Sequence, residues 1–153
     1  MKKWLLFLSL SMLLNAEDGL KKVVFELTTG DQKSFEQRVL NGIIKTKDYY
    51  QGNMQELDVA VVIHGDAYKF FIKNLSASPY RDDVELRSAR ESFEKRLRSS
   101  ANNYHVKFYM CEAGANNLKI AKENIYDFVT LVPTSTIGLI DKQSEGYVYL
   151  PIR

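Results

Sequence analysis

The chain has 153 residues and an apolar fraction of 45%, which is enough for one globular domain with a substantial core. Its 21 basic and 19 acidic residues nearly balance, so the composition excludes a strongly basic nucleic-acid-binding domain. Two histidines and one cysteine without ligand spacing argue against a zinc site, and no resident metal or cofactor is expected.

The first residues have the pattern of a secretory signal peptide. Lys2 and Lys3 precede an uncharged apolar run over residues 4–14, and Asn15-Ala16 offers a small-residue cleavage site. The run is shorter than the roughly 20 residues that a membrane-spanning helix needs. We expect cleavage after Ala16, a mature domain over residues 17–153, a periplasmic location and no stable membrane span after processing. The alternative is an uncleaved anchor or a buried N-terminal helix.

Continuous apolar runs predict five strands along the rest of the chain. They lie at residues 23–27, 57–63, 106–110, 128–132 and 147–152. Pro151 cannot donate to a strand ladder, so the last strand is expected at an edge of the sheet.

Helical patterns separate these strands. The first is expected after Ser34, whose spacing from Gln37 is that of a capping box, and the last after a Thr134 or Ser135 cap. Between them, helices are expected over residues 67–75, after an Asp66 cap, and over residues 82–102 and 117–124. Apolar strands that alternate with helices predict a single doubly wound α/β domain. Its five-stranded sheet should be mainly parallel, with helices on both faces.

Two chemically capable residues follow strands of this predicted sheet. His64 closes the second strand and Cys111 closes the third, so both belong to the carboxyl edge, where ligands and chemistry collect in this architecture. A helix that starts near Asn116 would favour the thiolate of Cys111. An unpaired cysteine in an exported protein suggests a reactive thiol or an intermolecular bond. Alternatively, Cys111 is a small buried residue that ends a core strand, and His64 only caps or pairs locally.

Three segments resemble the DsrE/DsrF-like family. They are IHGDAYKFF after the second strand, YMC at the end of the third, and VPTSTIGLIDKQSEGYVYLPI at the C-terminus. The resemblance covers about residues 23–152, and its most specific part is Gln143, Gly146, Tyr147 and Tyr149 together with the cysteine. It implies a small parallel α/β domain that forms homo-oligomers, often trimers or hexamers. In the sulfur-relay branch of the family, a cysteine at this strand end carries sulfur as a persulfide, and Cys111 is the matching position.

Three hypotheses for function follow. In the first, the protein is an exported sulfur carrier or sulfurtransferase, in which Cys111 passes sulfane sulfur between donor and acceptor proteins and His64 lies nearby. In the second, it is a non-catalytic oligomeric module that binds a small ligand or a protein, and Cys111 is buried and unreactive. In the third, it is a partner in thiol oxidoreduction, which the lack of a second cysteine disfavours.

Overall fold

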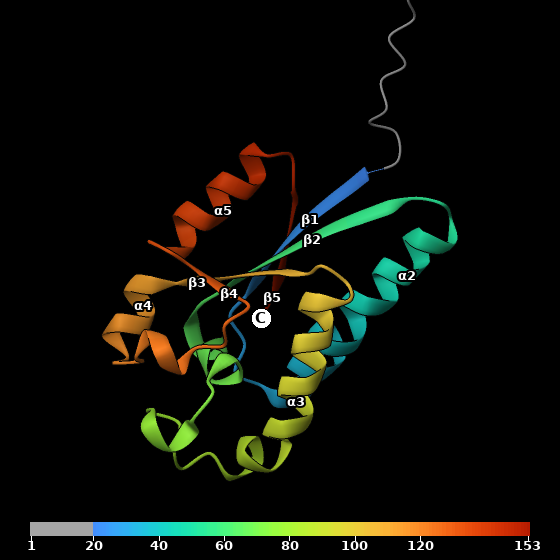
Figure 1. Cartoon of the computed structure of the whole chain (residues 1–153). Coiled ribbons are helices and arrows are strands. Elements are labelled where there is room, and N and C mark those ends of the chain that lie inside the picture. Colours follow the sequence, from blue (N-terminus) through green and yellow to red (C-terminus); the bar gives the residue numbers. More distant parts are fainter. Residues whose placement is uncertain (1–19) are drawn as a thin grey trace, which may run out of the picture.

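The sheet of the protein is five-stranded and entirely parallel, in the order β4-β3-β2-β1-β5 (Figure 1). The computed structural model describes residues 20–153, so the predicted signal peptide, residues 1–16, lies outside the described residues. The strands are β1 (Leu20–Leu27), β2 (Glu56–Ile63), β3 (Lys107–Cys111), β4 (Val129–Val132) and β5 (Val148–Ile152). The predicted α/β fold class is therefore confirmed.

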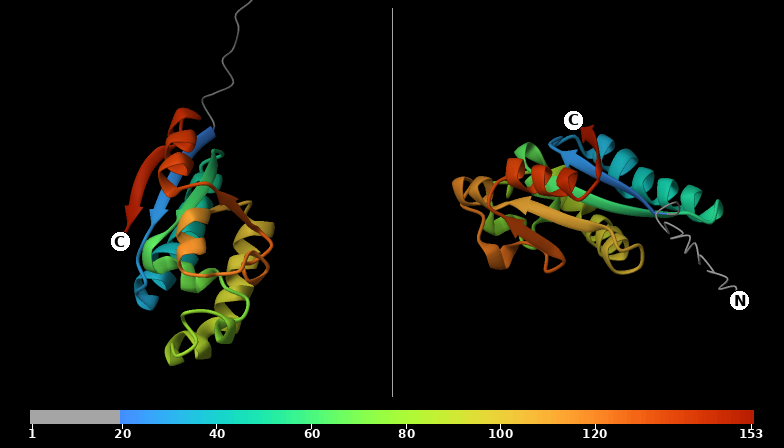
Figure 2. Two further views of the ribbon diagram at one scale, coloured as in Figure 1. Left: turned by 90° about the vertical axis from the view of Figure 1, so that its left-hand side faces the viewer. Right: turned by 90° about the horizontal axis from the view of Figure 1, so that it is seen from above.

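Strand β2 lies at the centre of the sheet because its side chains are apolar on both faces. Residues 59–63 of this strand have no solvent exposure, as is typical of a parallel sheet that is covered on both sides. Strand β5 pairs only with β1 and lies at the edge, as Pro151 predicts (Figure 2). Its side chains Val148 and Leu150 remain exposed.

Helices cover the two faces unequally. In chain order they are α1 (Gln32–Ser34), η1 (Phe35–Ile43), α2 (Ile44–Gly52), η2 (Gly65–Phe71), η3 (Leu75–Ala77), α3 (Val84–Asn102), α4 (Glu112–Asn117), η4 (Lys122–Asn124) and α5 (Ser135–Ser144). Helices α2 and α3 lie on one side of the sheet and α5 lies on the other (Figure 1). The α3 side holds the larger hydrophobic core, which includes Phe35, Phe93 and Leu97.

Within residues 20–153, α5 is the helix that covers the second face, and it approaches the sheet closely. The smaller core on this face consists of Val24, Ala60, Val62 and Tyr147. Gly138 of α5 is buried, and a Cβ atom at this position would lie 3.1 Å from Cγ2 of Val132. A glycine here lets the helix pack against the carboxyl ends of the strands.

Two predicted helix caps are wrong. Asp31, not Ser34, caps the first helical segment, because its carboxylate accepts a hydrogen bond from the Ser34 amide at 2.6 Å and the helix already begins at Gln32. Asp66 lies inside η2, and His64 occupies the capping position before this turn. Gly65 adopts a φ of +62°, which turns the chain directly after β2. The predicted Thr134 cap is confirmed, since its hydroxyl accepts from the Ile137 amide.

Two predicted helices are also wrong in extent. The segment expected to be helical over residues 67–75 is the short 3-10 turn η2, followed by a second turn, η3. The helix expected over 117–124 begins earlier, directly after Cys111, and ends at Asn117. Lys119 then takes a left-handed φ of 55°, so the chain reverses before the turn η4.

Among residues 20–153, no helix is both long enough and apolar enough to cross a lipid bilayer.

Candidate functional site

Cys111 lies at the carboxyl edge of the sheet, between two helices that leave toward opposite faces. It is the last residue of β3 and pairs with Val132, the last residue of β4. After β3 the chain enters α4, which packs Ala115 against the larger core. After β4 it enters α5, which covers the other face. In doubly wound sheets, the carboxyl edge where successive connections diverge to opposite faces is the usual place of ligand and reaction sites.

The Cys111 side chain is itself the N-terminal cap of α4. Its Sγ atom accepts a hydrogen bond from the Gly114 amide at 3.4 Å. Serine, threonine, aspartate or asparagine usually fills this position. A thiolate accepts such a bond more strongly than a neutral thiol does, because hydrogen bonds to an ionised acceptor are the stronger ones. The cap therefore favours the ionised sulfur.

The electrostatics of the site agree with this geometry. Burial alone would raise the pKa of the Cys111 thiol, since the side chain is only 7% exposed. The Gly114 amide, the Tyr68 hydroxyl and the amides of Ser135 and Ala113 oppose burial, and together they hold the pKa below its ordinary value. The predicted preference for a thiolate is thus supported, although the helix begins at Glu112 and not near Asn116.

Tyr68 is a site residue that the sequence did not reveal. It comes from η2, is 2% exposed, and its hydroxyl donates to the Cys111 carbonyl oxygen at 3.0 Å. It lies 43 positions before Cys111 in the chain. A buried phenol needs a hydrogen-bond partner, but the pattern AYKFF indicates only an apolar turn and gives no indication of which partner is chosen.

His64 lies on the same edge of the sheet, but it bonds a residue of β1, on the side of β2 that faces away from β3. Its Nε2 atom is 2.9 Å from Oε1 of Glu26 on β1. Glu26 also accepts a hydrogen bond from the Tyr149 hydroxyl, and Arg153 lies 3.9 Å from its second oxygen. Burial by itself would raise the pKa of the Glu26 carboxyl. The hydrogen bonds from Tyr149 and His64 and the charge of Arg153 outweigh burial, so the pKa lies below its ordinary value. Glu26 is therefore the carboxylate partner of His64.

The structure places His64 and Cys111 at the carboxyl ends of neighbouring strands but does not join them directly. Ile63 and Met110 are paired in the sheet, and the two residues follow these positions at the carboxyl edge. Within the described chain, the hydrogen bonds to the Cys111 sulfur come from other groups. The histidine ring is engaged by Glu26. The two predicted residues thus share an edge of the sheet without sharing a proton in this arrangement.

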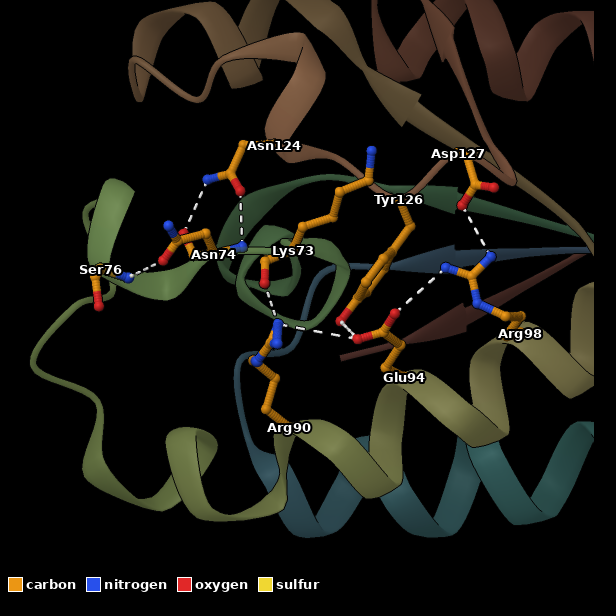
Figure 3. A network of polar contacts seen from close by, with 9 residues as sticks. All are labelled: Lys73, Asn74, Ser76, Arg90, Glu94, Arg98, Asn124, Tyr126 and Asp127. Carbon is orange, nitrogen blue, oxygen red and sulfur yellow. Dashed lines mark hydrogen bonds and ion pairs between the residues drawn. The ribbon is translucent and has the colours of Figure 1, made fainter.

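A polar network supports the loops that carry Tyr68 and α4. Figure 3 shows Asn124 against Asn74, and Tyr126 against Glu94 of α3. The Asn124 carboxamide accepts from the Asn74 amide at 2.7 Å and donates to the Asn74 carbonyl oxygen at 2.9 Å. An isolated antiparallel bridge between Ile72 and Ile125 lies beside these bonds. The segment after η2 and the segment after α4 are therefore held together.

No cluster of three or more histidine, cysteine, aspartate or glutamate side chains suited to a metal ion occurs within residues 20–153. The groups that donate toward the Cys111 sulfur are neutral amides and a hydroxyl. Such donors stabilise an anionic sulfur.

Comparison with known proteins agrees with this architecture. Residues 21–152 match the DsrE/DsrF-like family. An uncharacterized protein of Aquifex aeolicus (strain VF5) is 30% identical over 151 residues. These residues are 99% of this chain but 64% of the relative, so this chain spans less than two thirds of the relative's length. A solved structure of a protein of unknown function from Methanobacterium thermoautotrophicum matches with a TM-score of 0.57 and 19% identity, over 86% of this chain and 98% of that one, and has the same fold. Because the family match extends over nearly all of the described residues, the chain belongs to the DsrE/DsrF-like family.

Proposed function

We propose that this protein carries sulfane sulfur as a persulfide on Cys111 and passes it to a partner, as a sulfur carrier or sulfurtransferase. The observation that carries the proposal is the position of the thiol, which caps α4 at the carboxyl edge of the sheet among donors that lower its pKa. The thiolate is the nucleophilic form of cysteine. Membership of the DsrE/DsrF-like family supports the same role.

The proposed reaction is a thiol exchange. The Cys111 thiolate attacks the outer sulfur of a donor persulfide, a bond forms between Sγ and that sulfur, and the sulfur–sulfur bond of the donor breaks. The inner sulfur of the donor leaves as a thiolate with the bonding electron pair. The transferred outer sulfur keeps its proton, so Cys111 becomes a persulfide. A thiolate of the acceptor protein then removes the sulfur in the same way. The chain has only one cysteine, so no thiol of its own can displace the sulfur and form an internal disulfide.

We also propose that the protein acts outside the cytoplasm, because residues 1–16 have the pattern of a signal peptide. Donor and acceptor would then be periplasmic proteins. His64 is proposed to contribute from the neighbouring strand, with its ring oriented by Glu26.

The intact mass of the purified protein, before and after incubation with inorganic polysulfide, tests the proposal. We expect the mass to increase by one or more sulfur atoms, and a reductant should remove them. Cys111→Ser should show no increase. His64→Gln should slow the uptake without abolishing it, because the ring lies at the same edge of the sheet but bonds Glu26 and not the sulfur.

The second hypothesis, a binding module with an inert cysteine, rests on the burial of Cys111, which is 7% exposed. Alkylation of the native protein by iodoacetamide separates the two. Modification of the folded protein together with sulfur uptake supports the carrier. A protein that takes up no sulfur, and whose thiol reacts only after unfolding, would refute it.

A homo-oligomer, a trimer or hexamer, is the proposed assembly. Leu20, Val148 and Leu150 are exposed apolar residues on β1 and the edge strand β5, and they line a groove of about 550 Å³ between these strands and α2. Sedimentation velocity at micromolar concentration should show an oligomer, and Leu150→Glu should dissociate it. Met54→Glu is the matched control, since Met54 is 96% exposed and lies outside the groove. A monomeric wild-type protein would contradict this assembly.

A further inference from the structure

The hydroxyl of Tyr68 lies at the centre of the Cys111 site. It donates to the Cys111 carbonyl oxygen at 3.0 Å, and it packs against Gly114, whose amide donates to the Cys111 sulfur. Its interaction with the sulfur helps to lower the pKa of the thiol. The ring is 2% exposed, so the hydroxyl cannot turn to water without a change of the fold. Its position is set by the larger core, in which Tyr68 packs.

Gly114 leaves the room that this hydroxyl occupies. A Cβ atom at position 114 would lie 2.0 Å from the Tyr68 hydroxyl oxygen and 2.9 Å from the ring carbon that bears it. Real Cβ atoms do not approach other atoms so closely, and a buried aromatic ring cannot move aside cheaply. The amide of the same glycine donates to the Cys111 sulfur at 3.4 Å. Sulfur, hydroxyl and glycine therefore form one close-packed group from two parts of the chain, η2 and the junction of β3 with α4.

We propose that Tyr68 is a positioning residue for the sulfur chemistry of Cys111. Its hydroxyl has a single proton, which it donates to the Cys111 carbonyl oxygen while the thiol is neutral and to the sulfur when the sulfur is anionic. Gly114 is required because any side chain there would displace that hydroxyl. The role toward the persulfide rests on the proposed function. The role toward the thiolate does not.

The chemistry of a phenol suits this task. A hydrogen bond to an ionised acceptor is about twice as strong as one between neutral groups, so the hydroxyl stabilises the thiolate more than the thiol. Burial, the bond to Cys111 and the charge of its thiolate raise the pKa of Tyr68 well above its ordinary value. The phenol therefore keeps its proton throughout the pH range in which the thiol ionises. Phenylalanine has nearly the same shape but no donor.

The test is the pH dependence of iodoacetamide alkylation of Cys111 in the full chain. The midpoint of the profile reports the ionisation of the thiol, and the plateau at high pH reports access to it. Tyr68→Phe should move the midpoint upward, so that the rate at a fixed pH below the midpoint falls about tenfold, as expected for the loss of one hydrogen bond to a charged group. Tyr126→Phe is the matched control, because Tyr126 is equally buried at 2% and its hydroxyl bonds Glu94 instead.

Gly114→Ala provides a second, independent variant. It should move the midpoint in the same direction, because the new methyl group displaces the hydroxyl. In the Tyr68→Phe background its effect on the midpoint should be much smaller, since the hydroxyl that it displaces is gone, although the new methyl group still meets the ring carbon at 2.9 Å. Gly52→Ala is the control, because a Cβ atom at Gly52 meets no atom within 4 Å.

The possible results separate the two proposals. An unchanged midpoint in Tyr68→Phe, with only a lower melting temperature, would overturn the positioning role and leave Tyr68 as a packing residue. Additive effects of the two variants would overturn the role of Gly114. The alkylation profile needs no sulfur donor. A shifted midpoint in a protein that takes up no sulfur would thus contradict the carrier function and support the role of Tyr68 toward the thiolate.

Discussion

Replacing Phe35 with alanine is expected to lower the free energy of unfolding by about 3–5 kcal/mol. The Phe35 side chain has no solvent exposure, and its ring stacks on Phe70 with a centroid distance of 3.9 Å. The rings of Phe71 and Phe93 lie at 6.0 and 5.4 Å. Truncation loses the burial of the ring and leaves a cavity among side chains that can collapse only partly. Native domains are stable by only about 5–15 kcal/mol, so this loss is a large fraction of the total.

Equilibrium unfolding in urea, followed by circular dichroism, measures the effect. Tyr49→Ala is the control, because Tyr49 is 68% exposed and its truncation should change stability by less than about 0.5 kcal/mol. If Phe35→Ala unfolds within about 1 kcal/mol of the wild-type protein, the aromatic group on the α3 face does not hold the domain together as described.

Replacing Asn124 with alanine should destabilise the protein by about 2–3 kcal/mol and should also expose Cys111 to alkylation. Asn124 is 8% exposed, and its carboxamide makes two hydrogen bonds to backbone groups of Asn74 (Figure 3). A third hydrogen bond goes to the Ala77 carbonyl oxygen. Alanine leaves these backbone groups without a partner in a partly buried place. The segments after η2 and after α4 then lose three of the hydrogen bonds that join them, while the Ile72–Ile125 bridge remains.

Two measurements follow from this prediction. Urea unfolding gives the loss of stability, and the rate of iodoacetamide modification under native conditions gives the change in access to Cys111. Asn103→Ala, at the exposed end of α3, should alter neither by much. A destabilised Asn124→Ala protein with an unchanged alkylation rate would mean that the network supports the fold but not the site.

Much of the site could be predicted because strand ends are visible in a sequence. The apolar run that stops at Cys111 identifies the last residue of β3, and in a parallel sheet this residue must lie at the carboxyl edge. The same reasoning places His64 on that edge. It does not identify their partners, since Glu26 and Tyr68 lie 38 and 43 positions away from the residues that they contact.

The helix caps show where local patterns compete. Asp31 and Ser34 are both good capping residues, and the structure uses Asp31 because the chain turns soon after β1 ends at Leu27. After Cys111, the helix begins at once because the cysteine sulfur itself accepts the Gly114 amide bond. Sulfur is not among the usual capping groups, so the sequence pattern placed this helix too late.

The sequence by itself determined the number of strands, their parallel arrangement, the edge position of the strand that contains Pro151, and the place of Cys111. These properties follow from the periodicity of apolar residues and from backbone chemistry, both of which act over a few residues. Only the tertiary structure decided which groups surround the sulfur and which carboxylate binds His64. Strand order and register bring β5 beside β1, so that Tyr149 reaches Glu26, and the packing of η2 against α4 brings the Tyr68 hydroxyl to Gly114. Contacts of this kind depend on the joint burial of distant segments, which no local pattern encodes.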